Sequence, residues 1–232
     1  MVQPPTSSVE GATEIPPVGE HSPSTVPAAM ADHYFSHTPQ TPDAPRTLHL
    51  VLAGRDVTVT TTGGVFSGDR LDVGTRVLLR EVPDPPPTGN LLDLGCGWGP
   101  LALTLGLKSP RATVWAVDVN ARALDLTRHN ASALGLRSVR VCRPDDVPPD
   151  IRFAAIWSNP PIRVGKAELH AILLRWLPRL LPAGRAHLVV QRNLGADSLH
   201  RWLEGALGAE FAVERAGSAK GYRILDVTRH PA

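Results

Sequence analysis

From Asn90 onward the chain alternates between short apolar runs and longer amphipathic stretches, and this alternation restricts the fold more than any other feature. The pattern predicts buried strands that take turns with helices. Strands are expected at residues 91–94, 113–117, 139–142, 153–157 and 186–191, and helices at 100–108, 121–134, 167–181 and 198–207. Repeated β-α-β order is typical of a mostly parallel, doubly wound sheet. We therefore expect an α/β, Rossmann-like domain.

Two further strands, at 211–215 and 222–228, end the chain without a helix between them. They predict a C-terminal antiparallel hairpin in a seven-stranded sheet. Near the other end, the apolar runs 48–52 and 57–61 flank Ala53-Gly54-Arg55-Asp56 and predict a small β-hairpin. A short helix is expected after Leu71, followed by a proline-rich linker at 83–89.

The first thirty or so residues are rich in Pro, Ser, Thr and Val and show no periodicity. Such a segment cannot bury enough apolar surface to offset the entropy of ordering it. The expected organisation is a disordered tail at 1–30, an N-terminal β-hairpin extension with its linker at 31–87, and the main domain at 88–232.

Composition excludes several classes of protein. The net charge of +2 permits an RNA partner without demanding one. Two cysteines and nine scattered histidines provide neither a disulfide framework nor metal-ligand spacing, so we expect no metal. No apolar run approaches the ~20 residues that span a bilayer, and no signal peptide is evident. We expect a cytoplasmic monomer that has no membrane partner.

A glycine-rich loop follows the first strand of the main domain. Residues 93–99 read Asp-Leu-Gly-Cys-Gly-Trp-Gly and precede Pro100 at the start of a helix. Glycines allow positive φ and close approach of a ligand, which in such sheets binds at the carboxyl ends of strands. Pro100 stands where the dinucleotide fingerprint has Gly or Ala, and the Lys-Ser/Thr pair of a P-loop is missing. Nicotinamide, flavin and nucleoside triphosphate ligands are therefore disfavoured.

Acidic residues follow the next two strands. Asp118 could accept both hydroxyls of a ribose and would repel a nearby phosphate, so a nucleoside-like cofactor without phosphates fits best. Asp145 and Asp146 could accept a hydrogen bond from an adenine amino group. The alternative is that the glycine loop is only a tight β–α turn.

An Asn-Pro-Pro corner, Asn159-Pro160-Pro161, follows the apolar run 153–157. The prolines fix φ and remove two N–H donors, and Pro160 also biases Asn159 toward extended backbone. The corner is expected to present an amide side chain and bare carbonyl oxygens, which suit a planar amino group. Asn159 could instead be a structural cap or turn residue.

These motifs together resemble a known family. Residues 93–99 with Asp118 are similar to the cofactor motif of class I S-adenosylmethionine-dependent methyltransferases. Asn159-Pro160-Pro161-Ile162 resembles the amino-group methylation motif of the methyltransferase small domain group, and most of all that of RsmC-type ribosomal RNA guanine-N2 methyltransferases. Segments 64–67, 71–75 and 220–223 are also similar, and the resemblance covers about residues 45–230.

The resemblance implies an activity and a set of site residues. It implies methyl transfer from S-adenosylmethionine to an exocyclic amino group of ribosomal RNA, at guanine N2 of 16S rRNA, with the RNA or a ribosomal subunit as partner. Catalysis would fall to Asn159, Pro160, Pro161 and Ile162. The cofactor contacts would be Asp93, Gly95, Cys96, Gly97, Gly99, Asp118, Val119, Asp145, Asp146 and Asn159, joined by Phe66 and Thr75 unless these two only pack.

Basic residues surround the expected active edge and could contact RNA phosphates, or simply form a solvated surface. They are Arg163, Lys166, Arg192, Lys220 and Arg223. Trp98 and Trp157 are expected to pack in the core.

The chain departs from its relatives in two ways. Ile162 stands where many members of the family that it resembles carry an aromatic residue that stacks on the target base, and we do not expect the second, degenerate half that some of them use to hold RNA. Methylation of adenine N6, methylation of a protein glutamine, and binding of the cofactor without catalysis therefore stay open as alternatives.

Overall fold

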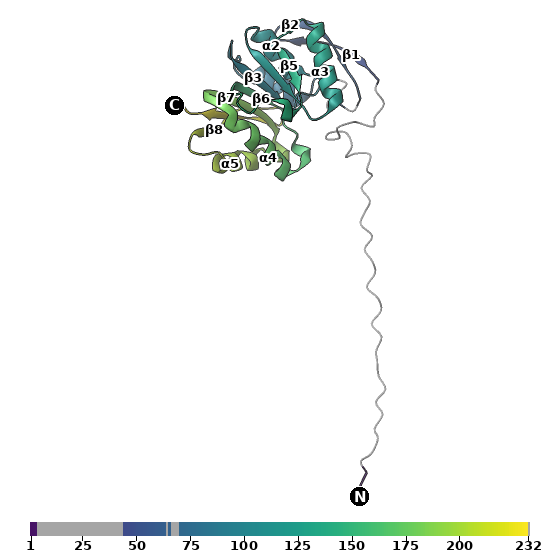
Figure 1. The fold of residues 1–232 in the computed structure, drawn as a ribbon, viewed down its shortest axis with the longest axis vertical. Helices are drawn as coiled ribbons and strands as arrows, with labels where there is room; N and C mark the ends of the chain where they lie inside the picture. Colours follow the sequence, from purple (N-terminus) through teal and green to yellow (C-terminus); the bar gives the residue numbers. More distant parts are fainter. Residues whose placement is uncertain (4–43, 64, 66–69, 232) are drawn as a thin grey trace.

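The computed structural model describes residues 1–3, 44–63, 65 and 70–231, except for the side chain of Arg163. Phe66 and almost all of the expected tail at 1–30 lie outside the described residues. Figure 1 shows a layered domain in which helices cover a central twisted sheet, and a small hairpin lies beside it.

The central sheet has seven strands in the order β5-β4-β3-β6-β7-β9-β8. β9 is antiparallel to its neighbours β7 and β8, and the pairings from β5 to β7 are parallel. This confirms the predicted doubly wound sheet and its terminal hairpin. The strands are β3 (Asn90–Leu94), β4 (Thr113–Val117), β5 (Val139–Cys142), β6 (Phe153–Ser158), β7 (Leu180–Gln191), β8 (Phe211–Ala219) and β9 (Tyr222–Arg229).

Helices cover both faces of the sheet and pack against its apolar side chains. Leu169 and Leu173 of α4 and Leu199 of α5 pack on one face, and Leu78 of α1 and Leu101 of α2 pack on the other. Trp98 and Trp157 are buried, as predicted. The helices are α1 (Val73–Glu81), α2 (Pro100–Lys108), α3 (Ala121–Ala133), α4 (Lys166–Trp176) and α5 (Ala196–Ala206).

The predicted N-terminal hairpin consists of β1 (Arg46–Leu52) and β2 (Arg55–Thr61). Ala53 and Gly54 form its two-residue turn, both with positive φ, which is the backbone geometry that matches the twist of paired strands. Buried hairpin residues such as Val59 pack in one cluster with Leu103 of α2 and with residues of α3. The hairpin therefore covers the outer side of the two helices that flank the glycine loop.

One predicted helix is wrong at its C-terminal end. The helix expected at 167–181 stops at Trp176, a short 3-10 turn (Leu177–Arg179) follows, and Leu180 begins β7 opposite Phe153. Pro178 explains the stop, because proline lacks an N–H and its ring clashes with the preceding helical turn. Leu180 is fully buried as a strand residue, so its apolar character had fitted the helical spacing by coincidence.

Candidate active site

The two motifs meet at the point where the strand order reverses. Leu94, the last residue of β3, lies directly beside Ser158, the last residue of β6. The buried Ser158 hydroxyl donates to the carbonyl oxygen of Leu94 at 2.7 Å. The glycine loop and the Asn-Pro-Pro corner therefore leave the sheet from adjacent positions, where ligands bind in open α/β sheets.

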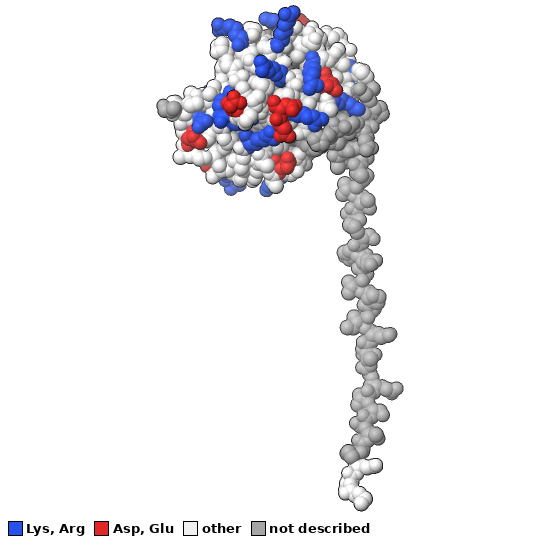
Figure 2. All heavy atoms as spheres, in the orientation of Figure 1, with Lys and Arg blue, Asp and Glu red and all other residues white. Residues whose placement is uncertain are grey.

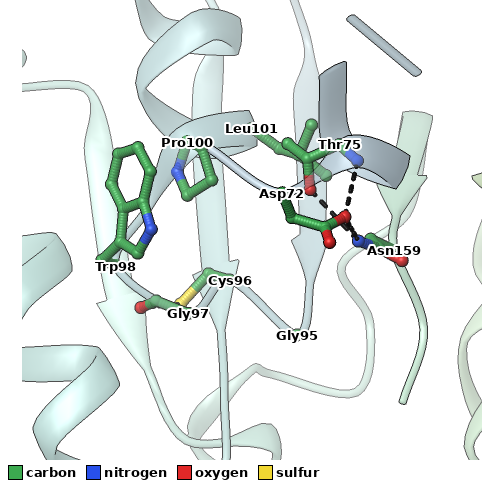
Figure 3. Close-up of a pocket in the computed structure, with 9 residues that line it drawn as sticks. All are labelled: Asp72, Thr75, Gly95, Cys96, Gly97, Trp98, Pro100, Leu101 and Asn159. Carbon is green, nitrogen blue, oxygen red and sulfur yellow. Dashed lines mark hydrogen bonds between the residues drawn. The ribbon is translucent and has the colours of Figure 1, made fainter. Parts of the chain in front are cut away.

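A pocket lies between these two segments, as Figure 3 shows. Five of the predicted site residues line it, together with Asp72 and three residues near the start of α2. Because a lining residue need not touch the ligand, the predicted roles remain predictions. The lining residues are Asp72, Thr75, Gly95, Cys96, Gly97, Trp98, Pro100, Leu101 and Asn159.

The backbone of the glycine loop is held open toward the pocket. The N–H groups of Gly95 and Cys96 both donate to the carbonyl of Val117, at 2.8 and 3.0 Å. Gly95 and Gly97 have φ of 78° and 56°, and a Cβ added at either would meet nothing within 4 Å. That free space next to the main chain allows a ligand to approach closely. Gly99 differs, because its added Cβ would come within 3.0 Å of Thr127.

Asp93 lies fully buried beneath the loop. Its Oδ2 accepts from the N–H of Ala102 in α2 at 2.8 Å, while its Oδ1 has no partner among the described residues. Burial raises the pKa of this carboxyl to about 8, against the opposing effect of the Ala102 bond, and the charge of Asp118 adds to the rise. A buried carboxyl oxygen that lacks a partner indicates a place where a ligand could donate.

Asp118 closes the loop from the end of β4. Its Oδ2 accepts from Gly97 N–H at 3.0 Å and its Oδ1 from Asn120 N–H at 2.9 Å. Burial raises the pKa of Asp118, and these backbone bonds oppose the rise. Each carboxylate oxygen has a second lone pair, so hydroxyl donors can still bind there. Burial and the nearby Asp118 and Asp93 also raise the pKa of the Cys96 thiol, which therefore stays protonated.

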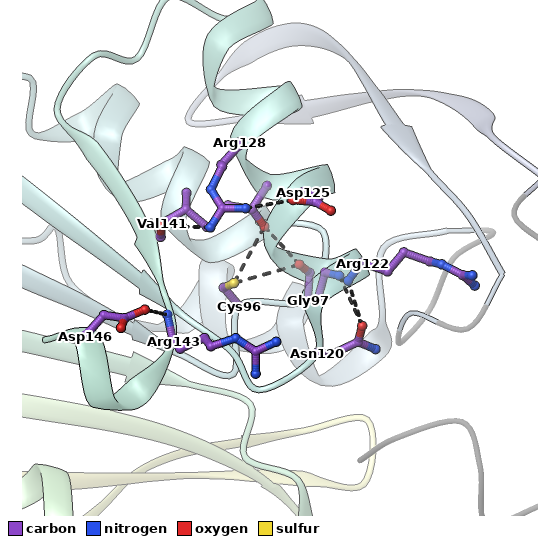
Figure 4. Close-up of polar contacts among 11 residues, drawn as sticks. Cys96, Gly97, Asn120, Arg122, Asp125, Arg128, Val141, Arg143 and Asp146 are labelled. Atoms are coloured by element: carbon purple, nitrogen blue, oxygen red, sulfur yellow. Dashed lines mark hydrogen bonds and ion pairs between the residues drawn. The ribbon is translucent and has the colours of Figure 1, made fainter. Parts of the chain in front are cut away.

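Two side chains of α3 donate hydrogen bonds to carbonyls of the loop, and Figure 4 shows Cys96 and Gly97 of the loop near this helix. The Thr127 hydroxyl donates to the carbonyl of Gly97 at 2.9 Å. The buried Asn130 amide donates to the carbonyls of Trp98 and Thr60, at 3.0 and 2.8 Å, and accepts from the Thr60 N–H at 2.7 Å. Asn130 thus ties the N-terminal hairpin to the glycine loop, a link that sequence reasoning did not find.

The Asn-Pro-Pro corner is tighter than expected. Pro161 has φ −74° and ψ 79°, the inverse γ-turn conformation, and the N–H of Ile162 donates to the carbonyl of Pro160 at 2.9 Å. Val164 N–H also donates to the carbonyl of Pro161, at 3.3 Å. The prediction of bare carbonyl oxygens is therefore wrong, because the chain folds back on itself. Each oxygen still keeps a second lone pair.

Asp72 is the site residue that sequence reasoning missed. Its Oδ2 accepts from the side-chain amide of Asn159 at 2.8 Å and from the backbone N–H of Thr75 at 3.0 Å. The indications in the sequence are that Asp72 lies in the segment 71–75 that resembles the family and that it stands near the start of a predicted helix, the usual place for an N-terminal cap. The structure confirms that cap.

Three of the predicted cofactor residues, Val119, Asp145 and Asp146, are not among those that line this pocket. The exposed Asp145 pairs with Arg175 at 2.8 Å, and Asp146 caps the N–H of Arg143 at 3.1 Å in the short turn Pro144–Asp146. The carbonyl of Val119 accepts from Arg143 at 3.5 Å. Their roles in cofactor binding stay predictions.

The predicted RNA-contacting residues divide into two groups. Lys166, Arg192 and Lys220 are exposed, whereas the guanidinium of Arg223 is mostly buried against Asp197 of α5. Arg223 thus forms an ion pair with Asp197, and its contact with an RNA phosphate stays a prediction. The side chain of Arg163 lies outside the described residues. Figure 2 shows Lys and Arg side chains interspersed with Asp and Glu on the face that it presents.

Both cysteines are free, as expected. Within the described residues, no helix is long and apolar enough to cross a membrane.

Comparison with known proteins gives consistent matches. Residues 56–226 match the methyltransferase small domain family. The chain is 35% identical over 199 residues to YbxB of Bacillus subtilis, an uncharacterized protein, with 84% of this chain and 98% of YbxB covered. It is 37% identical over 172 residues to the ribosomal RNA small subunit methyltransferase C of Photorhabdus laumondii, with 72% of this chain and 50% of that protein covered.

A solved structure extends the likeness to three dimensions. RsmC of T. thermophilus, a 16S rRNA N2 methyltransferase in complex with AdoMet and guanosine, aligns with a TM-score of 0.69 and 25% identity. The match covers 83% of this chain and 52% of that one. The chain therefore spans about half the length of the methyltransferase C relatives that it matches.

Proposed function

The chain belongs to the methyltransferase small domain family, and from that premise we propose that it methylates an exocyclic amino group of a base in ribosomal RNA. The methyl donor is S-adenosylmethionine, and the proposed target is guanine N2 of small-subunit 16S rRNA. One observation carries the proposal: the glycine loop and the Asn159 amide line a single pocket. The named activities of the methyltransferase C and RsmC relatives support the choice of substrate.

The residues around the loop fit S-adenosylmethionine. Open space beside Gly95 and Gly97 leaves room for a ligand to lie against the main chain. Asp93 has an unpartnered buried oxygen, and Asp118 has lone pairs for hydroxyl groups. The Asp118 carboxylate suits a ligand with two ribose hydroxyls and disfavours a phosphate nearby. Asp93, Gly95, Cys96, Gly97 and Asp118 would therefore hold the cofactor.

The reaction needs the amine to be oriented more than it needs a base. An exocyclic amine is a weak nucleophile because its lone pair is delocalised into the ring of the base. Asn159 Oδ1 and the Pro160 carbonyl oxygen, through its second lone pair, would accept hydrogen bonds from the two N–H groups of the amine. These bonds would direct the lone pair of the amine nitrogen toward the methyl group. S-adenosylmethionine supplies an electrophilic methyl group on a sulfonium, so positioning can provide much of the rate. The nitrogen gives up one proton to solvent as the N–C bond forms and the S–CH3 bond breaks, with the electron pair of that bond remaining on sulfur.

The RNA must present the base outside a helix. A base stacked in a duplex cannot reach a pocket at the end of a sheet, so the target is unpaired or flipped out. We propose that the exposed Lys166, Arg192 and Lys220 contact nearby phosphates. Ile162 is partly buried against the core, so it offers an apolar edge to the base without an aromatic face.

Methyl transfer to ribosomes tests the proposal. Tritiated S-adenosylmethionine is incubated with 16S rRNA, or with small subunits, from a strain that lacks the gene, and the labelled nucleoside is identified by mass spectrometry. The expected product is N2-methylguanosine. Labelled N6-methyladenosine or methylglutamine would show a different substrate, and binding of the cofactor with no transfer to RNA would refute the proposal.

Two variants separate the two halves of the pocket. Asn159→Ala is expected to abolish transfer and leave the affinity for S-adenosylhomocysteine almost unchanged. Asp118→Ala is expected to weaken that affinity, measured by calorimetry. Loss of cofactor affinity in Asn159→Ala would contradict the role assigned to the amide.

A further inference from the structure

The amide of Asn159 is held in a single orientation. Its Nδ2 donates one N–H to Asp72 Oδ2 at 2.8 Å and the other to Thr75 Oγ1 at 3.1 Å, as the dashed lines in Figure 3 show. An amide nitrogen has only two N–H groups, so both are used. Among the described residues, no group donates to Asn159 Oδ1, and this oxygen remains available to a substrate.

The Asp72 carboxylate disfavours the flipped orientation of the Asn159 amide. An ionised carboxylate only accepts hydrogen bonds, so a flipped Asn159 would place its oxygen against Asp72 Oδ2. That arrangement loses a charge-assisted hydrogen bond and adds a repulsion between two oxygens. Thr75 is 3% exposed, so water cannot readily replace its hydroxyl as the partner.

Asp72 is itself fixed by helix α1. It caps the helix through the N–H of Thr75, and its carbonyl accepts from the N–H of Arg76 at 2.9 Å. A Cβ added to Gly74 would come within 2.9 Å of the Asp72 carboxylate and within 2.8 Å of the Tyr222 ring, so glycine is needed for this close packing. Burial, together with the charge of Asp72, raises the pKa of Tyr222.

We propose that Asp72, assisted by Thr75, is a positioning residue that turns the oxygen of Asn159 toward the substrate and thereby selects an amino group. This inference rests on the proposed function. An oxygen at this place binds the N–H of a base amine, whereas a flipped amide would present N–H groups and bind a base carbonyl. The carboxylate also polarises the amide, which makes Asn159 Oδ1 a stronger acceptor.

Variants of Asp72 separate its two contacts. Asp72→Ser keeps a good helix cap, because serine caps helices well, but its shorter side chain does not reach Asn159. Asp72→Asn keeps an acceptor of the same length. Thr75→Val removes the hydroxyl at nearly constant volume, and Thr75→Ser restores it.

We expect Asp72→Ser to lower kcat for RNA methylation by about 10- to 100-fold, which is the scale of losing one oriented group at a reacting centre. The affinity for S-adenosylhomocysteine should change by less than about twofold, because it does not depend on the orientation of the amide, and KM for RNA should change less than kcat, because phosphate contacts also bind the RNA. Thr75→Val should lower kcat less, since a neutral hydroxyl is a weaker partner than a carboxylate. Asp72→Asn keeps an acceptor without the charge, so its kcat should lie between those of Asp72→Ser and the wild type, and Thr75→Ser should retain most of the wild-type kcat.

A second measurement does not depend on activity. In ¹⁵N-labelled full-length protein, the side-chain amide protons of Asn159, assigned by their loss in Asn159→Ala, should exchange slowly with water. Asp72→Ser should make their exchange fast, and Asp72→Asn should keep it slow.

The two readouts distinguish the failure of each idea. If the wild-type protein transfers no methyl group to RNA, the proposed function fails, and the exchange measurement still decides whether Asp72 orients the amide. If the wild-type protein is active and Asp72→Ser keeps its kcat, or if the exchange of the Asn159 amide is the same in both proteins, the inference is overturned.

Discussion

Replacement of Asp93 by asparagine should reveal the cost of burying this carboxyl group. The pKa of Asp93 rises from 3.8 in the unfolded chain to about 8 in the fold. Between these two values the folded protein holds a proton that the unfolded chain has released. Stability must therefore fall as pH rises through this window. Asparagine does not titrate, and its oxygen can still accept from the N–H of Ala102, so the variant should lack this loss.

The magnitude follows from the two pKa values. Each pH unit inside the window costs the wild-type protein about 1.4 kcal/mol. Between pH 5 and pH 7, the free energy of unfolding of Asp93→Asn should gain roughly 3 kcal/mol relative to the wild type. Above pH 8 the folded protein also releases the proton, and the difference should level off.

Urea denaturation of both proteins at pH 5, 6, 7, 8 and 9 measures this difference directly. Asp56→Asn is the matched control, because Asp56 is an exposed carboxylate on β2 and its removal should change stability by less than about 0.5 kcal/mol at every pH. A difference between Asp93→Asn and the wild type that stays constant from pH 5 to pH 8 would show that burial does not control this group.

Three other perturbations test the framework around the site. Asn130→Asp should destabilise the protein by about 2–6 kcal/mol, because two buried carbonyl oxygens lose their donors, and thermal unfolding would measure this. Gly97→Ala should weaken S-adenosylhomocysteine binding at least tenfold in calorimetry, because its methyl group fills the space next to the loop, whereas Gly54→Ala, which also has positive φ, should leave binding unchanged. Ser158→Ala should cost about 1–3 kcal/mol in urea denaturation, because the carbonyl of Leu94 loses its hydroxyl donor; no loss of stability would indicate that the two strand ends hold together without this bond.

Much of the fold could be predicted because its determinants are local. Buried parallel strands are continuous apolar runs, and caps such as Asn120, which accepts from Arg122 N–H at 3.0 Å, mark where helices begin. The end of α4 could not be placed from periodicity, since an apolar residue such as Leu180 fits a buried strand as well as the buried face of a helix. Pro178 offered the better indication there.

The site was predictable where the chemistry lies in a short motif. The glycine loop and Asn159 could be found from the residues next to them, and parallel pairing of their strands brings them together. Asp72 could not be assigned, because its contact with Asn159 spans 87 residues and depends on how α1 packs. For the same reason, nothing in the sequence showed that Asp197 would form an ion pair with Arg223.

These sequence separations also set an order for the assembly of the site during folding. The bond from Gly97 to Asp118 closes 21 residues, whereas those from Ser158 to Leu94 and from Asn159 to Asp72 close 64 and 87. Longer closures cost more chain entropy and are favoured only after much of the domain is in place. A partly folded chain can thus shape its glycine loop early but has no oriented amide, so the proposed methyl transfer would begin only after most of the domain has formed.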